Sequence, residues 1–296
     1  MLILQGALSL GLLWSLMTIG VFLTYRILEM PDLSVEGTII LGASMAASMI
    51  AADGDPMIAT LAAAGVGCLG GLVTGILHTK FKIPPILAGI LTMIGSYSVV
   101  IRILGTSNVS LLRIRTIFSP LVDIGLTNRN AVIAFGGAVV LGIGILLFWF
   151  FSTELGSAIR ATGNNRQMVK AQGVNTDGMI ILCLMISNGL VGLSGALIAQ
   201  DQGFASVDMG AGTIVIGLAS VIIAEVLFRV RSFWGRLISL VAGAIIYRLI
   251  IALVLEMGMA PTDLRLFQAI TVAVALTLPI IRERLGKLTK RIGKGA

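Results

Sequence analysis

Long apolar stretches separated by short polar ones run along almost the whole chain. About nine of them reach the roughly 20 residues that a helix needs to cross a hydrocarbon core of about 30 Å. Runs of this length lack the alternation of apolar and polar residues that a membrane β-barrel requires. The pattern therefore predicts an all-α polytopic transmembrane helix bundle of about nine or ten spans. The predicted spans are residues 3–25, 36–52, 56–78, 83–105, 131–152, 178–200, 212–228, 236–257 and 264–281.

The composition agrees with a membrane protein. Of the 296 residues, 57% are hydrophobic and only 12% are charged, and the mean hydropathy is +1.02. We expect residues 1–296 to form one transmembrane domain without a soluble domain. The first apolar stretch has no basic residue before it and is followed by Arg26, so it is typical of a retained span rather than a cleaved signal peptide. Cys68 and Cys183 both lie inside apolar runs, where cysteine behaves as a small hydrophobic residue.

The basic residues predict the orientation. Counting nine spans places most basic connections, and the basic tail at residues 282–296, on one side of the membrane. The positive-inside rule makes that side cytoplasmic, with the C-terminus inside and the N-terminus outside. Four arginines oppose this assignment: Arg102, Arg113, Arg115 and Arg129. The loops and tail account for the net charge of +7 through contact with lipid headgroups, so no nucleic-acid partner is required.

One long polar passage, residues 153–177, interrupts the apolar pattern. Its charged residues exclude burial in lipid, so we expect it in the cytoplasm. The sequence predicts a short helix at residues 155–162 that stops at Gly163, and a second one capped by Asn164 and ending at Gly173. On these residues alone, the passage is either a preformed docking element or an ordered connection between two spans.

The motifs ELGSAIRATGNN and AQGVN in this passage resemble the cytoplasmic loop of permease subunits in bacterial ABC importers of the branched-chain amino acid, ribose and simple-sugar family. In that family the loop carries a coupling helix that sits in a groove of the ATPase subunit. The matching positions are Glu154, Gly156, Arg160, Gly163, Asn164, Asn165 and Gly173. We predict that four side chains of the loop face the ATPase: Arg160, Asn164, Asn165 and Arg166.

Two further stretches extend the resemblance over most of the chain. DLSVEGT at 32–38 is similar to a signature of the family, and GTIVIGLASVIIAE at 212–225 is similar to its late span. Glu36 stands where sugar permeases usually carry glycine, which argues against a sugar. The stretch PDLSVEGTIILGA looks closest to the permeases assigned to tryptophan or tyrosine uptake.

The resemblance implies a type II ABC importer in the bacterial cytoplasmic membrane, working by alternating access. The implied partners are a homodimeric ATPase that carries ATP and Mg, an extracytoplasmic substrate-binding protein and a second permease copy. The chain itself has no G-x-x-x-x-G-K-[ST] phosphate loop and no metal or nucleophile cluster, so we expect a permease subunit and not an enzyme. An ion-coupled secondary transporter, an intramembrane enzyme, and a sugar or nucleoside permease are the alternatives.

A short motif that occurs twice in the chain suggests where the translocation path lies. GTIILG at 37–42 and GTIVIG at 212–217 each follow an aspartate and enter spans of opposite direction, as inverted repeats do, although coincidence is an alternative for so short a match. Arg248 falls near the middle of its predicted span, where a cation needs a partner or a water-filled cavity. The path candidates are Asp32, Ser34, Glu36, Asp208 and Arg248. The repeated Gly67, Gly71 and Gly75 predict a close helix contact, either within the subunit or between two copies.

Overall fold

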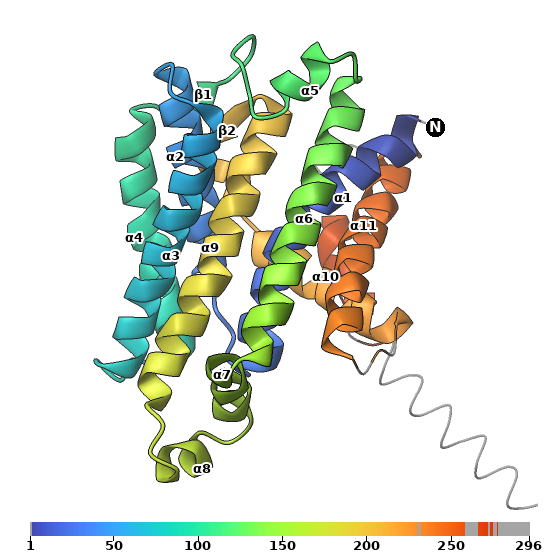
Figure 1. Cartoon of the computed structure of the whole chain (residues 1–296). Helices are drawn as coiled ribbons and strands as arrows, with labels where there is room; N and C mark the ends of the chain where they lie inside the picture. The colour runs from blue at the N-terminus through green and yellow to red at the C-terminus, as the bar shows by residue number, and fades with distance from the viewer. Residues whose placement is uncertain are drawn as a thin grey trace, which may run out of the picture.

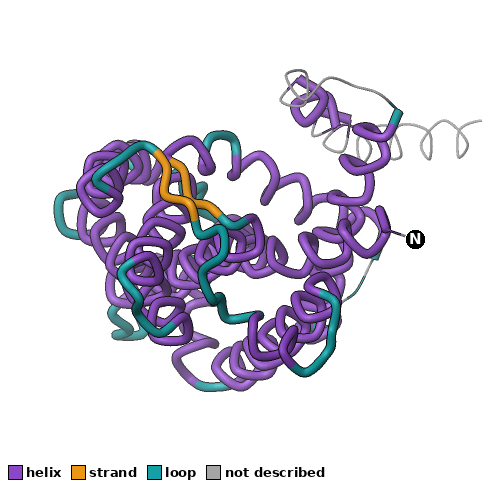
Figure 2. Tube along the Cα trace, turned by 90° about the horizontal axis from the view of Figure 1, so that it is seen from above, coloured by secondary structure: helices purple, strands orange, loops and turns teal. Residues whose placement is uncertain are grey.

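The computed structural model describes residues 2–228, 230, 232–257, 266–271, 273–274 and 277. It is a bundle of long helices with a two-stranded antiparallel sheet at one end (Figures 1 and 2). The long helices are α1 (Leu2–Phe22), α2 (Val35–Ala51), α3 (Pro56–Thr79), α4 (Pro85–Leu104), α6 (Asn128–Ser152), α9 (Thr176–Gln202), α10 (Thr213–Leu227) and α11 (Phe233–Glu256). The short elements are η1 (Leu23–Ile27, a π-helix), β1 (Asn108–Ser110), α5 (Ser119–Asp123), α7 (Glu154–Asn164), α8 (Arg166–Ala171), β2 (Phe204–Ser206) and η2 (Val207–Gly210).

The predicted all-α bundle is confirmed. Within the described residues, 7 helical segments are long and apolar enough to cross a membrane, and α2 is a shorter apolar helix. Each of the first eight predicted spans coincides with one of these helices. Of the ninth predicted span, residues 264–281, the structure describes 266–271, 273–274 and 277, and the basic tail at 282–296 lies outside the described residues.

The two ends of the bundle differ in charge. We call the end that carries α7 and α8 the α7 end, and the end that carries β1 and β2 the sheet end (Figure 1). The acidic connection with Asp53 and Asp55 lies at the sheet end, between α2 and α3. Basic side chains gather at the α7 end, as the sequence predicted: His78, Lys80, Lys82, Arg160, Arg166, Lys170 and Arg236. The four arginines that oppose the assignment, Arg102, Arg113, Arg115 and Arg129, lie toward the sheet end, as the sequence also predicted.

Local sequence signals set where several helices begin and end. The Asp55 carboxylate caps α3 by accepting from the backbone N–H of Met57 at 2.7 Å, and Pro56 occupies the first turn. Helix α9 ends at Gly203 with φ of 75°, in the left-handed region that glycine adopts without strain. These caps satisfy backbone groups that a helix end would otherwise leave unpaired.

Backbone-to-backbone contact holds α3 against α9. A Cβ added at Gly67 or Gly71 would overlap backbone atoms of Asn188 or Leu184, and one at Gly75 would press on Ile181. The four-residue repeat of glycines therefore packs inside the subunit, which decides between the two contacts that the sequence left open.

Two helices begin inside the bundle rather than at its ends. The chain leaves η1 at the α7 end and returns to the middle of α9 before α2 starts, and the segment after β2 descends from the sheet end before α10 starts (Figure 1). Helix α2 then runs toward the sheet end, where Ser48 bonds the carbonyl of Ile103, whereas α10 runs toward the α7 end, where Glu225 meets Arg26. The two copies of the repeated motif thus run in opposite directions, as inverted repeats do.

Candidate functional site

The beginnings of α2 and α10 meet at one place in the bundle. The Glu36 side chain, in the first turn of α2, accepts a hydrogen bond from the backbone N–H of Gly212 at 3.1 Å. Gly212 is the N-cap of α10 with φ of 80°, and Gly210 lies so close to the backbone of Glu36 that it has no room for a Cβ. A carboxylate at a helix N-terminus complements the positive end of the helix dipole, so Glu36 connects the beginning of α2 to the beginning of α10. We call this meeting point of the two helix beginnings the junction.

A fully buried polar network lies directly beside this junction. Asp32 accepts from the Ser34 hydroxyl at 2.6 Å and from the Asn188 amide at 2.8 Å. The Asn188 carbonyl oxygen in turn accepts from Thr38 at 2.7 Å. No cation pairs with Asp32 within the described part of the chain, so hydrogen bonds alone satisfy its carboxylate.

The junction also has an accessible acidic side. Glu36 is half-buried and Asp208 is exposed, and the phenol of Tyr97 on α4 lies within electrostatic range of both carboxylates. None of the described residues form a group of three or more His, Cys, Asp or Glu side chains that could hold a metal. Two carboxylates beside an aromatic ring can bind an organic cation such as an ammonium group.

The structure brings together four of the five predicted path residues and separates the fifth. Four of them lie at or just before the beginnings of α2 and α10: Asp32, Ser34, Glu36 and Asp208. Arg248 lies on α11 with its guanidinium 3.9 Å from the centre of the Trp14 ring.

Arg248 lines a different pocket, of about 340 Å³, between α1, α6 and α11. Sequence position places Arg248 inside the span that α11 forms, but the face it occupies depends on how the helix packs. Arg248 therefore does not belong to the junction.

The polar passage folds as two short helices, but one turn differs from the prediction. Helix α7 continues through Gly163 to Asn164, and α8 is capped by Asn165, whose side chain accepts from the N–H of Met168 at 3.0 Å. The predicted stop at Gly163 and the predicted cap by Asn164 are therefore wrong by one or two residues. Gly163 is required for another reason, because a Cβ there would overlap the carbonyl oxygen of Ile27.

Arg160 is exposed, and its guanidinium also contacts the end of the bundle. Its guanidinium donates to the carbonyl of Phe151 and lies 5.9 Å and 5.7 Å from the ring centres of Phe151 and Phe233. Arg160 thus clamps α7 onto α6 and α11, because a guanidinium stacks well on aromatic faces.

Of the other predicted loop residues, some are exposed and others contact the rest of the bundle. Glu154, Asn164 and Asn165 are exposed, and Gly156 packs tightly on the end of α6. Gly173 has φ of 83° and ends the second short helix, as predicted. Arg166 pairs with Asp177 at 2.6 Å, and Lys82 reaches the same carboxylate at 3.7 Å.

Sequence reasoning missed several residues of these regions. Asn188 and Tyr97 complete the junction, and an asparagine inside an apolar span was the available signal for the first of them. Leu155 and Met168 present apolar side chains on the surface of α7 and α8, each 48% exposed.

The fold and the junction define a class of protein. Multi-pass bundles in which interrupted helices of opposite direction meet around a polar centre are typical of solute transporters. Residues 3–278 match the family described as branched-chain amino acid transport system, permease component, and the chain belongs to this family of ABC-type permeases.

Curated relatives cover most of the chain. It is 40% identical to the tyrosine transport system permease protein of Clostridioides difficile (strain R20291), over 95% of this chain and 93% of the relative. It is 30% identical to an uncharacterized protein of Rickettsia prowazekii (strain Madrid E), over 93% of this chain and 97% of that one. It is 24% identical to the ribose import permease protein of Escherichia coli (strain K12), over 73% of this chain and 66% of that one. No solved structure matches it.

Proposed function

We propose that this chain is the transmembrane subunit of an ABC importer that carries an amino acid, most favourably tyrosine or another aromatic one, across the bacterial cytoplasmic membrane. The observation that carries the proposal is the junction of α2 and α10, with Glu36, Asp208 and Tyr97 at its accessible side. The carboxylates attract the ammonium group of an amino acid, and the phenol offers a partner for an aromatic ring. The relative named for tyrosine transport supports the same substrate class.

The α7 end is the proposed docking surface for the ATPase and therefore the cytoplasmic end. Its excess of basic residues agrees with the positive-inside rule, and its exposed surface includes Leu155 and Met168 beside Asn164 and Asn165. Two permease copies would receive two ATPase subunits, which bind ATP and Mg, while an extracytoplasmic binding protein delivers substrate at the sheet end. The exposed apolar faces of α4 and α6 are available for lipid or for the second copy.

Two alternative functions rest on specific observations. Acidic residues at the junction are also what an ion-coupled secondary transporter would use. The more distant ribose permease relative supports a sugar substrate. Glu36 favours a cationic group over a neutral sugar, because a carboxylate that is half-buried gains from an opposite charge.

Uptake by proteoliposomes that hold the permease, its co-expressed ATPase and its binding protein tests the proposal. We expect L-tyrosine uptake that needs ATP, is stopped by vanadate, persists with a protonophore and is not reduced by excess ribose. Uptake that ignores vanadate and stops with the protonophore would show a secondary transporter. Competition by ribose but not by phenylalanine or tryptophan would show a sugar permease.

A further inference from the structure

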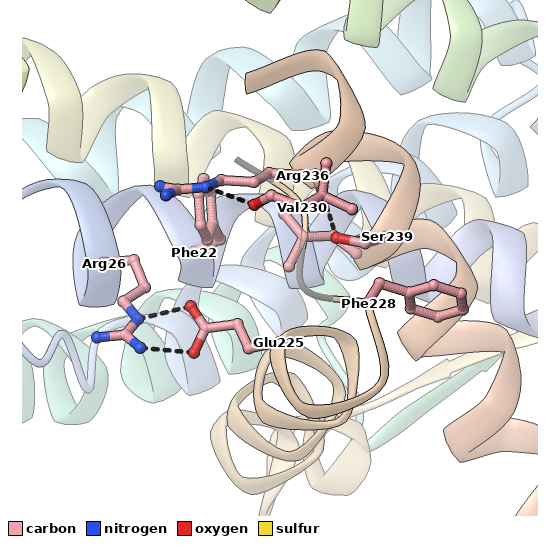
Figure 3. Close-up of a pocket in the computed structure, with 8 residues that line it drawn as sticks. Phe22, Arg26, Glu225, Phe228, Val230, Arg236 and Ser239 are labelled. Carbon is pink, nitrogen blue, oxygen red and sulfur yellow. Dashed lines mark hydrogen bonds and ion pairs between the residues drawn. The ribbon is translucent and has the colours of Figure 1, made fainter. Parts of the chain in front are cut away.

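We infer that Arg26 and Glu225 are positioning residues that transmit the movement of α7 to α10 and so to the substrate junction. This inference rests on the proposed function, because it assigns the route by which ATPase docking reaches the path. It starts from one ion pair between elements far apart in the sequence. Arg26 donates from Nε and Nη2 to the two carboxylate oxygens of Glu225, both at 2.6 Å (Figure 3).

The first step of the route is the contact between α7 and η1. Gly163 of α7 lies directly on the carbonyl oxygen of Ile27, the last residue of η1, with no space for a Cβ. Contact through backbone atoms transmits displacement without the slack of a flexible side chain. Any movement of α7 toward the bundle therefore moves η1.

The second step is the π-helical geometry of η1 itself. Residues Leu23–Ile27 form one π-helical segment at the end of α1, and Glu29 just after it has φ of 54°. A π-helical turn within an α-helix is rare and frequently marks a functional position, because its hydrogen-bond register can shift. Arg26 therefore stands on η1, the irregular continuation of α1, where a shift relative to α1 is possible.

The third step is the ion pair. Two parallel N–H to oxygen bonds fix the distance and also the relative orientation of guanidinium and carboxylate, which a single bond does not. The side chains of Arg26 and Glu225 are 53% and 35% exposed, so the pair contributes little to the free energy of folding. Such a pair is better suited to orienting η1 and α10 than to stabilising the bundle.

The space around the pair allows it to change. Arg26 and Glu225 line a pocket of about 400 Å³ together with Phe22, Phe228 and Arg236 (Figure 3). Side chains that border an open volume can reorient without repacking a core. The contact can thus follow a movement of η1 or open during one.

The last step is α10, which joins the pair to the junction. Glu225 lies near the end of Thr213–Leu227, and Gly212 at its beginning donates its backbone N–H to the Glu36 carboxylate. A helix of 15 residues is about 22 Å long and moves as a rod. Displacement at Glu225 therefore reaches the acidic side of the junction.

The test uses a labelling readout that does not depend on the substrate. Ala211, exposed directly before α10, becomes the reporter Ala211→Cys in a Cys68→Ala, Cys183→Ala background, in the permease–ATPase complex. Its labelling rate by a water-soluble maleimide is compared with and without ATP and vanadate. The variants are Arg26→Gln, Glu225→Gln and the exchange Arg26→Glu with Glu225→Arg. The control is Arg115→Gln, which breaks an exposed ion pair with Asp123 at the sheet end.

We expect each single neutral variant to reduce the nucleotide-dependent change in labelling by about fivefold or more, since coupling between distant sites is typically of this size. The exchanged pair should restore most of the change, Arg115→Gln should preserve it, and all variants should melt as the parent complex does. Single variants that retain the full change, or an exchanged pair that assembles but restores nothing, would overturn the inference.

Failure of the proposed function gives a different result. A parent complex that shows the nucleotide-dependent change but does not take up tyrosine disproves the proposed substrate and leaves the route standing. A parent complex that takes up tyrosine with ATP but whose Ala211→Cys labelling is unaffected by nucleotide disproves the route and leaves the proposed function standing.

Discussion

Replacing Asn188 by leucine should separate the role of the buried network in transport from its role in stability. The two side chains have the same branching and the same number of heavy atoms, so the change removes hydrogen bonds without opening a cavity, while the methyl groups of leucine fill more space than the amide. Thr38 keeps its bond to the carbonyl of Ser34 at 3.1 Å, and the Ser34 hydroxyl keeps its bond to Asp32 at 2.6 Å. Only one carboxylate oxygen of Asp32, which received the amide of Asn188 at 2.8 Å, loses its partner.

The expected loss of stability is about 1.5–3 kcal/mol, the range for hydrogen bonds to charged groups. Gln200→Leu is the matched control, because Gln200 is also buried on α9 and its amide bonds Thr60 at 2.9 Å near the sheet end. Thermal unfolding in detergent and tyrosine uptake are measured for both. Both variants should melt earlier, but only Asn188→Leu should abolish uptake. Normal uptake in Asn188→Leu, or equal loss in Gln200→Leu, would refute the reasoning.

Two further predictions concern α7 and the junction. Gly163→Ala should lower stability by about 1–3 kcal/mol through overpacking and reduce ATPase co-purification, whereas Gly142→Ala, which has open space on α6, should not. Equal melting temperatures of the two variants would contradict this. Glu36→Gln keeps an acceptor for the N–H of Gly212 but removes the charge, so tyrosine uptake should fall about tenfold, a difference of about 1.4 kcal/mol, with little change in melting. Unchanged uptake would show that the charge of Glu36 does not serve the substrate.

The spans were predictable because length and apolarity are local properties, and the signals at Asp55 and Gly203 lie next to the helix ends they set. The turn between α7 and α8 was displaced because Asn164 and Asn165 have the same capping chemistry. The choice between them depends on the packing of Gly163 against Ile27, far away in the sequence.

In the candidate path, too, contacts between residues far apart in the sequence could not be predicted. The repeated motif identified the beginnings of α2 and α10, yet nothing local indicates that Asn188 meets Asp32 or that Arg26 meets Glu225. Arg248 shows that the span to which a residue belongs is readable from sequence, whereas rotation about the helix axis follows from neighbours such as Trp14.

The glycine contacts between α3 and α9 impose an order on biogenesis. Helices α2 and α3 are synthesised before α4, α5, α6, α7 and α8, and α9 follows only after all of these. Until then Asp32 and Ser34 lack the amide of Asn188, and the groove along Gly67 and Gly71 lacks the backbone that fills it. Newly inserted chains must keep this polar groove hydrated or covered by the insertion machinery, since lipid cannot satisfy it. A chain that stalls before α9 therefore exposes the groove and the unpaired polar groups of Asp32 and Ser34 to quality-control proteases.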